Sequence, residues 1–181
     1  MNLKRKSRRK MGITGPIIFI IALFVIITIV FIGLTSSNDI RNLAAPPRKD
    51  LTLALIPANL KTSPNTPSTL SVILNNTSGM NVTGAEIHLN YDPTKMSVNS
   101  ITEGTLLPVV LTSGQVDNGT ISITLGSLPT NPVTTSGIIA TVTFIPVTTT
   151  QISFANTSVV TAIGYNTSVL KGTVGAKIQV R

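Results

Sequence analysis

Glu86, His88 and Asn90 have the side-chain types and spacing that come nearest to a chemical site in this sequence. They stand two residues apart, and the residues between them, Ile87 and Leu89, are apolar. Successive side chains of a β-strand point to opposite faces, so this spacing places all three polar side chains on one face. A carboxylate, an imidazole and an amide on one face can bind a metal, transfer a proton or contact a partner protein.

A metal site would need further ligands beside His88, which is the only histidine in a chain without cysteine. Zinc sites draw on several His, Cys or acidic ligands at matched spacing, and the sequence shows none. The residues Asp39, Asp50, Asp92 and Asp117 do not follow the spacing of a calcium-binding loop. We therefore expect no metal and no cofactor, with His88 as a solvated surface residue.

The acids Glu86, Asp92, Glu103 and Asp117 are the only ones after residue 50, and three of them stand at predicted turns. A glycosidase holds two carboxylates about 5–10 Å apart across a cleft, and nothing in the sequence pairs two of these acids. No serine lies in a Gly-x-Ser-x-Gly elbow, and no glycine-rich phosphate loop precedes a helix. We expect no catalytic residue, and an enzyme is the least favoured class.

The segment Val82–Val98 is expected to position the three polar residues, because it reads as strand, turn and strand. Its apolar side chains alternate with the polar ones, and Asp92–Lys95 interrupts the alternation with a proline, which cannot donate to a strand ladder. Alternation then resumes at Met96 and Val98. The apolar set, expected to face inward, is Ala85, Ile87, Leu89 and Tyr91.

Similar strands, separated by turn signals every 8–12 residues, fill the chain from Leu51 onward, and no amphipathic helix interrupts them. This spacing is typical of an all-β protein, an antiparallel β-sandwich of about nine strands. Asp117-Asn118-Gly119 is a strong signal for a tight hairpin turn. The expected strands lie at Leu51–Pro57, Leu70–Asn76, Val82–Tyr91, Met96–Thr102, Leu106–Thr112, Thr120–Gly126, Gly137–Ile145, Gln151–Phe154, Ser158–Thr161 and Val174–Val180.

Charge is concentrated at the N-terminus, where Met1–Lys10 holds six of the 14 Lys and Arg residues and no acid. The net charge is +8, so only +2 remains for the rest of the chain. A near-neutral body with a basic tip does not indicate a nucleic-acid-binding protein.

The segment Pro16–Leu34 follows this tip, and from Ile17 to Leu34 it contains no charged residue. A run of 18 or more apolar residues crosses a bilayer core of about 30 Å, and the basic tip favours a cytoplasmic N-terminus. A cleaved signal peptide and a buried core helix are the alternatives; the long apolar core and the poor cleavage site favour a retained anchor. We expect a cytoplasmic tip at 1–12, a transmembrane signal-anchor at 13–34, a linker at 35–50 and an extracellular domain at 51–181.

The order of motifs from Leu51 to Val180 resembles that of cohesin domains, the scaffoldin modules of cellulosomes. Each motif alone is ordinary strand and turn sequence, and their common order over about 130 residues makes the resemblance specific. The segments that carry it are Gly84–Leu89, Tyr91-Asp92-Pro93, Met96, Gly104–Pro108, Asp117–Ile121, Ser136–Phe144, Ile152–Phe154 and Gly164-Tyr165-Asn166.

The resemblance implies a nine-stranded jelly-roll sandwich that binds rather than catalyses. In cellulosomal members one sheet face grips dockerin helices, and the acidic position on that face corresponds here to Glu86. A second contact strand corresponds to Thr120–Leu125. The sequence leaves its register undetermined by one residue, and a shift of one residue would exchange the side chains on its two faces. The sequence shows no dockerin, catalytic module or second cohesin. The expected partner is therefore either a dockerin-like protein or another adhesive protein.

Two further functions remain open, carbohydrate binding linked to polysaccharide catabolism, and a structural role in the cell envelope. The chain has no tryptophan and two tyrosines, Tyr91 and Tyr165, which argues against cellulose-type stacking but not against polar sugar recognition. Asn-x-Ser/Thr triplets mark either turns or glycosylation sites in a host with that machinery. They begin at Asn75, Asn76, Asn81, Asn118, Asn156 and Asn166.

Overall fold

A computed structural model describes residues 50–181, and the elements in this range are twelve β-strands in two sheets. The basic tip at 1–12, the predicted membrane helix at 13–34 and nearly all of the linker at 35–50 lie outside the described residues. Within residues 50–181 no helix is long and apolar enough to cross a bilayer. Residues 50–181 belong to one compact unit with its own core, the property that allows a domain to fold by itself.

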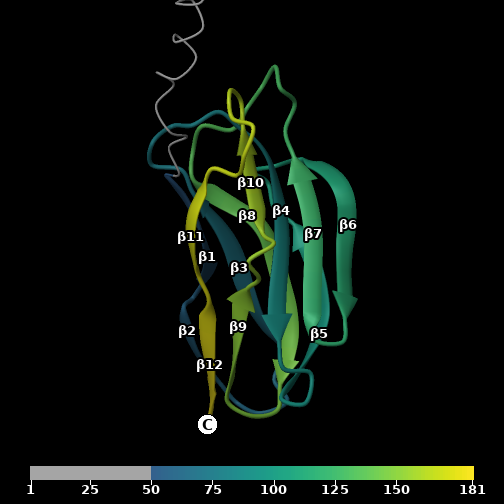
Figure 1. Ribbon diagram of the computed structural model, residues 1–181. Helices are drawn as coiled ribbons and strands as arrows, with labels where there is room; N and C mark the ends of the chain where they lie inside the picture. The colour runs from purple at the N-terminus through teal and green to yellow at the C-terminus, as the bar shows by residue number, and fades with distance from the viewer. Residues whose placement is uncertain (1–49) are drawn as a thin grey trace, which may run out of the picture. The chain divides into compact units, whose positions relative to one another are not determined.

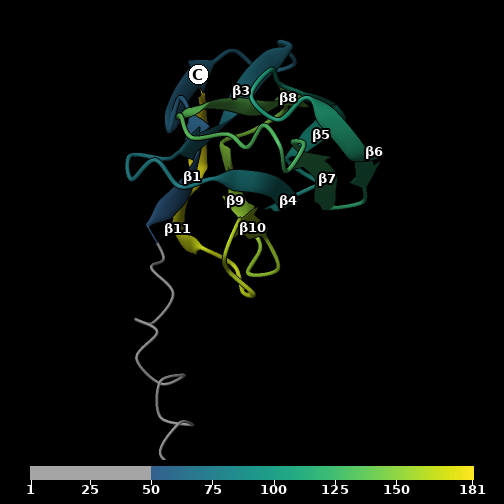
Figure 2. The same ribbon diagram turned by 90° about the horizontal axis from the view of Figure 1, so that it is seen from above.

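The two sheets face each other as a sandwich, which Figures 1 and 2 show from the side and from above. Sheet A runs in the order β11 (Leu170–Val174), β1 (Leu51–Ile56), β3 (Ser68–Asn75), β8 (Gly137–Pro146) and β5 (Met96–Glu103). Sheet B runs in the order β2 (Asn59–Thr62), β12 (Ala176–Val180), β9 (Thr150–Phe154), β4 (Val82–Tyr91), β7 (Thr120–Gly126) and β6 (Val109–Asp117). The remaining strand, β10 (Val159–Ala162), pairs with β4 in sheet B.

Two segments pass from one sheet to the other and tie the sandwich together along one side. The chain leaves β1 through the cis Ile56–Pro57 peptide bond and enters sheet B as β2, and β11 continues past Gly175 as β12. Gly175 passes so close to β9 that a Cβ there would lie 2.6 Å from the Ile152 carbonyl oxygen. The segments pair with each other in parallel in both sheets, whereas the other ladders are antiparallel.

The predicted all-β sandwich is confirmed, with three corrections. The count of about nine strands is too low, because β2 and nearly all of β11 lie where no strand was expected; the strand expected at Val174–Val180 is β12. The sandwich is not purely antiparallel, since β1–β11 and β2–β12 are parallel pairs. The strand predicted at Leu106–Thr112 begins later and runs to Asp117, directly up to the predicted hairpin turn.

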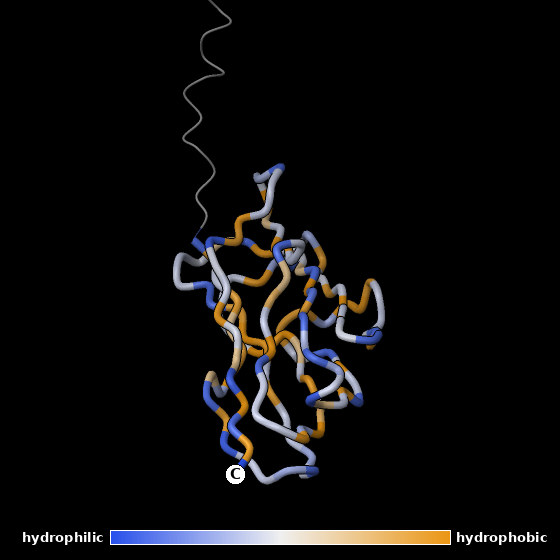
Figure 3. The backbone as a smooth tube through the Cα atoms, turned by 60° about the horizontal axis from the view of Figure 1, so that its bottom comes forward, coloured by the Kyte–Doolittle hydropathy of each residue, from blue (hydrophilic) through white to orange (hydrophobic). Residues whose placement is uncertain are grey.

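The core fills the space between the inward faces of the sheets. In β4, Ala85, Ile87 and Leu89 are buried as predicted, and Phe144 of β8 is among the largest fully buried side chains. Tyr91, expected inward, is half-buried at the end of β4, where its hydroxyl donates to the Asp117 carbonyl oxygen at 3.2 Å. Figure 3 shows hydrophobic residues along the strands and hydrophilic ones at many of the turns.

A β-bulge reverses one predicted side-chain direction in β8. The alternation of Ile138, Ala140, Val142 and Phe144 predicts a common inward face, yet Ile138 is 42% exposed. The register of β3 against β8 shifts between Val72 and Ile73, so Ile138 pairs with the outward Ile73. One extra residue in a bulge exchanges the faces beyond it, which explains the error.

Asn76, one of the six candidate glycosylation residues, is buried, and its side chain stabilises a turn through hydrogen bonds to the Met80 backbone. It is 4% exposed, and its side-chain oxygen accepts the Met80 N–H at 2.9 Å while its amide donates to the Met80 carbonyl at 2.7 Å. The same amide lies 3.4 Å from the Val133 carbonyl. The folded domain therefore leaves the Asn76 amide inaccessible to a glycosylating enzyme.

Candidate protein-binding face

Glu86, His88 and Asn90 lie together on the outer face of β4, as the alternation predicts. The His88 Nε2 atom is 2.8 Å from the Glu86 Oε1 atom, and these side chains are 32% and 50% exposed. The imidazole is thus held by a neighbouring carboxylate and is not merely solvated. Asn90 is exposed two residues further along the strand.

β7 extends this face, and the structure fixes the register that the sequence left open. Ile121 and Ile123 are buried, so the hydroxyl residues of β7 face outward beside the polar residues of β4. The cross-strand pairs are Glu86 with Thr124, His88 with Ser122, and Asn90 with Thr120. The segment Thr120–Leu125 therefore contributes Thr120, Ser122 and Thr124 to the face.

β6 forms the border of the face and adds an apolar residue that sequence reasoning missed. The ladder between β6 and β7 shifts twice, and Thr112 and Gln115 are the residues paired with Thr124 and Ser122. Leu111 stands at the first shift, is 63% exposed and lies against Gly126. No periodic signal could find it, because the irregular ladder decides where its side chain points.

The predicted hairpin turn connects β6 to β7 and lies beside the C-terminal end of β4 at Tyr91. Asp117 pairs with Thr120, so Asn118 and Gly119 form the connection. Gly119 has a φ of 92°, a conformation that a side chain would disfavour. Its carbonyl accepts the Tyr91 N–H at 3.0 Å, which ties the turn to the end of β4.

Ser158 binds the β4 backbone at His88, where the strand paired with β4 changes from β10 to β9. β4 pairs with β10 up to Glu86 and with β9 from Leu89, which leaves the His88 backbone between the two strands. The buried Ser158 hydroxyl accepts the His88 N–H at 3.1 Å and donates to the His88 carbonyl at 3.0 Å. The Ser158 hydroxyl thus replaces a strand partner for the His88 N–H, and the His88 carbonyl also accepts the Ala155 N–H at 2.8 Å.

We expect Ser158→Ala to lower the free energy of unfolding by about 1–3 kcal/mol, because it removes the partner of the His88 N–H, while the His88 carbonyl still accepts the Ala155 N–H. Urea unfolding of residues 46–181 measures the loss, and amide hydrogen exchange should accelerate at His88. Thr157→Ala, at the exposed neighbouring position, is the control and should change stability by less than about 0.5 kcal/mol. Equal losses in the two variants would contradict this role.

Asp92 stabilises the turn that follows β4. The Thr94 hydroxyl and N–H donate to Asp92 Oδ1 at 2.6 and 2.9 Å, and these bonds, with Lys95 nearby, hold the pKa of Asp92 below its ordinary 3.8. Because the pKa of Asp92 is lower in the folded chain, its carboxylate stabilises the fold at pH values above 3.8, and this stabilisation is lost as the pH falls through the lowered pKa.

No group of three or more His, Cys, Asp or Glu that could hold a metal occurs within residues 50–181.

The cohesin domain family model matches residues 56–180 of this sequence. The chain belongs to the cohesin domain family. This confirms the resemblance and agrees with the observed sandwich. No curated protein matches the chain.

Solved cohesin structures share the fold at low sequence identity. Cohesin CaCohA2 from Clostridium acetobutylicum has a TM-score of 0.60 at 20% identity, covering 74% of this chain and 92% of that chain. The third cohesin ScaC from Acetivibrio cellulolyticus, in complex with the ScaB dockerin, has a TM-score of 0.61 at 16% identity, covering 72% and 99%. A non-cellulosomal cohesin from the archaeon Archaeoglobus fulgidus has a TM-score of 0.60 at 15% identity, covering 73% and 92%.

The outer face of β4, β7 and β6 in this cohesin domain is polar with little net charge. Hydroxyl and amide side chains cover it, Glu86 and His88 form one hydrogen-bonded pair, and Leu111 supplies exposed apolar surface at its border. Such a surface offers a partner its shape, small polar groups and one exposed leucine, and it carries little charge for electrostatic steering.

Proposed function

We propose that this cohesin domain is a non-catalytic module that binds a protein partner of the dockerin type, or a similar adhesive partner, through the outer face of β4, β7 and β6. The feature that carries the proposal is the row of cross-strand polar pairs around His88 and Ser122, bordered by Leu111. Because these strands are part of a rigid sheet, the face is preorganised, and a partner need not order it on binding. The ScaC cohesin in complex with the ScaB dockerin is the precedent for such a partner.

The proposal also places the domain on the outer side of a membrane, held by its N-terminal segment. This part is supported by the sequence, in which the basic tip at 1–12 precedes the apolar run at 13–34. The linker at 35–50 contains Pro46-Pro47 and mixed charge, a composition suited to a spacer between membrane and domain. A domain held in this way would display its binding face at the cell surface.

A single experiment on intact host cells tests both parts of the proposal. The full chain is treated with a membrane-impermeant amine cross-linker, which reaches exposed lysines such as Lys61, Lys171 and Lys177 only if the domain lies outside. We expect the chain in the membrane fraction, labelled and cross-linked to one partner protein. Glu86→Arg should stay labelled and lose the cross-linked partner, since it reverses a charge within the face.

Three results would count against the proposal. An unlabelled chain in intact cells that becomes labelled after lysis would overturn the extracellular placement. Recovery in the soluble fraction would overturn the anchor. A partner that cross-links equally to the Glu86→Arg variant would overturn the assignment of this face.

A further inference from the structure

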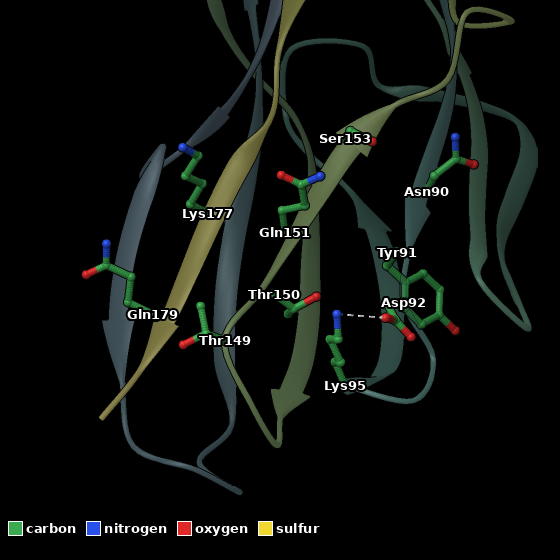
Figure 4. A pocket seen from close by; sticks show the side chains of 10 residues that line it. All are labelled: Asn90, Tyr91, Asp92, Lys95, Thr149, Thr150, Gln151, Ser153, Lys177 and Gln179. Carbon is green, nitrogen blue, oxygen red and sulfur yellow. Dashed lines mark ion pairs between the residues drawn. The ribbon is translucent and has the colours of Figure 1, made fainter.

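A groove of about 550 Å³ lies on the outer side of sheet B beside the proposed protein-binding face, with which it shares Asn90 of β4. Figure 4 shows Gln151 and Ser153 of β9 between Lys177 of β12 on one side and Asn90 of β4 on the other. The volume falls within the range of about 300–1,000 Å³ that small-ligand pockets occupy. The lining residues are Asn90, Tyr91, Asp92, Lys95, Thr149, Thr150, Gln151, Ser153, Lys177 and Gln179.

The floor of the groove offers side chains and no free strand edge. β12 pairs with β9 and β2, while β9 pairs with β12 over Thr150–Ile152 and with β4 over Ile152–Phe154. Both are interior strands of sheet B, so the groove contains no edge strand to which an extended peptide could add. Recognition must come from side chains meeting a ligand that carries its own dense set of hydrogen-bonding groups.

The side chains of the groove match the hydroxyl groups of a sugar. Amide and hydroxyl side chains each donate and accept hydrogen bonds, as sugar hydroxyls do. Tyr91 adds a ring that is held in place, because its hydroxyl donates to the Asp117 carbonyl. The amide residues are Asn90, Gln151 and Gln179, and the hydroxyl residues are Thr149, Thr150 and Ser153.

The charge of the groove is positive. Lys177, which pairs across the strands with Gln151, is exposed and makes no ion pair with another described residue. Lys95 is neutralised by Asp92, with 3.2 Å between Nζ and Oδ2. At the β2 side of the groove, Lys61 pairs with Gln179 in the parallel ladder. Figure 3 shows hydrophilic residues alternating with hydrophobic ones along the two strands beside the C-terminus.

We propose that this groove binds a short acidic saccharide, a chain of uronic acid units whose carboxylate pairs with Lys177. The neighbouring amides and hydroxyls contact the sugar hydroxyls, and the Tyr91 ring borders one sugar unit. The site lies over β9, β12 and the Asn90–Tyr91 end of β4, so it does not include Ser122, and its ligand is not the proposed protein partner.

The test measures binding of trigalacturonate to the full chain in detergent micelles by calorimetry. We expect binding that weakens at least tenfold in Lys177→Glu and weakens with added salt, because the charges are exposed. Lys171→Glu is the matched control, since Lys171 is exposed on β11 in sheet A, and it should bind as the unchanged chain does. The neutral trigalactose should bind at least tenfold more weakly than trigalacturonate.

Absence of trigalacturonate binding at millimolar concentration would overturn the inference. Equal weakening in Lys177→Glu and Lys171→Glu would do the same, since it would reflect net charge alone. Tighter binding of tetraglutamate than of trigalacturonate would overturn the saccharide assignment and indicate an acidic peptide as the ligand of the groove. Ser122→Arg should leave saccharide binding unchanged, so failure of this inference and failure of the protein-binding proposal are distinguishable.

Discussion

Replacing Phe144 with alanine should lower the free energy of unfolding by about 3–5 kcal/mol, the largest loss we expect from a single side chain. Phe144 is fully buried in β8, between Ser68 of β3 and Val98 of β5 in the register of sheet A. Truncation removes buried apolar surface and leaves a cavity that the rigid strands on both sides cannot close. Because domains of this size are stable by about 5–15 kcal/mol, the loss is a large fraction of the total.

Urea unfolding of residues 46–181 gives the measurement, and Ile145→Ala gives its control. Ile145 is the next residue of the same strand, half-buried on the outer face, so its truncation should cost less than about 1 kcal/mol. If Phe144→Ala fails to fold, Phe144→Leu, which keeps most of the volume, should fold with a loss below about 1.5 kcal/mol. Equal losses at positions 144 and 145 would contradict the assignment of the two faces.

The sequence predicts the organising strand correctly because a local pattern determines its faces. One face of β4 packs on the core and the other meets solvent, so Ile87 and Leu89 alternate with Glu86, His88 and Asn90. The same reasoning finds the hairpin at Asn118-Gly119, since the turn chemistry lies within two residues. Both features depend on neighbours along the chain and not on distant partners.

Prediction fails where a distant strand decides the local geometry. Ile138 points outward because of a register shift against β3, which the β8 sequence does not record. Leu111 reaches the proposed protein-binding face through irregular pairing with β7. The passage of β11 into β12 depends on the close approach of Gly175 to β9. In each case the determining contact joins residues that are far apart in sequence.

The candidate sites divide in the same way. Glu86, His88 and Asn90 stand on one strand, so alternation alone groups them. The support from Ser158 joins residues 70 positions apart, and no spacing rule connects them. The groove combines β4, β9 and β12, whose neighbourhood is a property of the sheet order. Its residue types are also ordinary for surface strands, so only their assembly distinguishes them.

Replacing Ser122 with arginine should weaken binding of the protein partner at least a hundredfold, the largest effect on function that we expect. Ser122 is half-buried on β7, between His88 of β4 and Gln115 of β6, at the middle of the face. A long charged side chain there would separate the two surfaces and leave an unpaired charge in the contact, which costs several kcal/mol. Calorimetry with the cross-linked partner, once purified, measures the loss.

Ser71→Arg is the matched control, because Ser71 is a half-buried serine on the outer face of sheet A, on β3 between Ile56 and Thr141 of the neighbouring strands. It introduces the same charge and bulk at an equivalent strand position, so both variants should unfold at similar urea concentrations. Retained binding in Ser71→Arg with loss in Ser122→Arg would locate the partner on sheet B. The reverse result would move the partner to sheet A, where the exposed Ile56 and Ile138 lie, and would refute the proposed face.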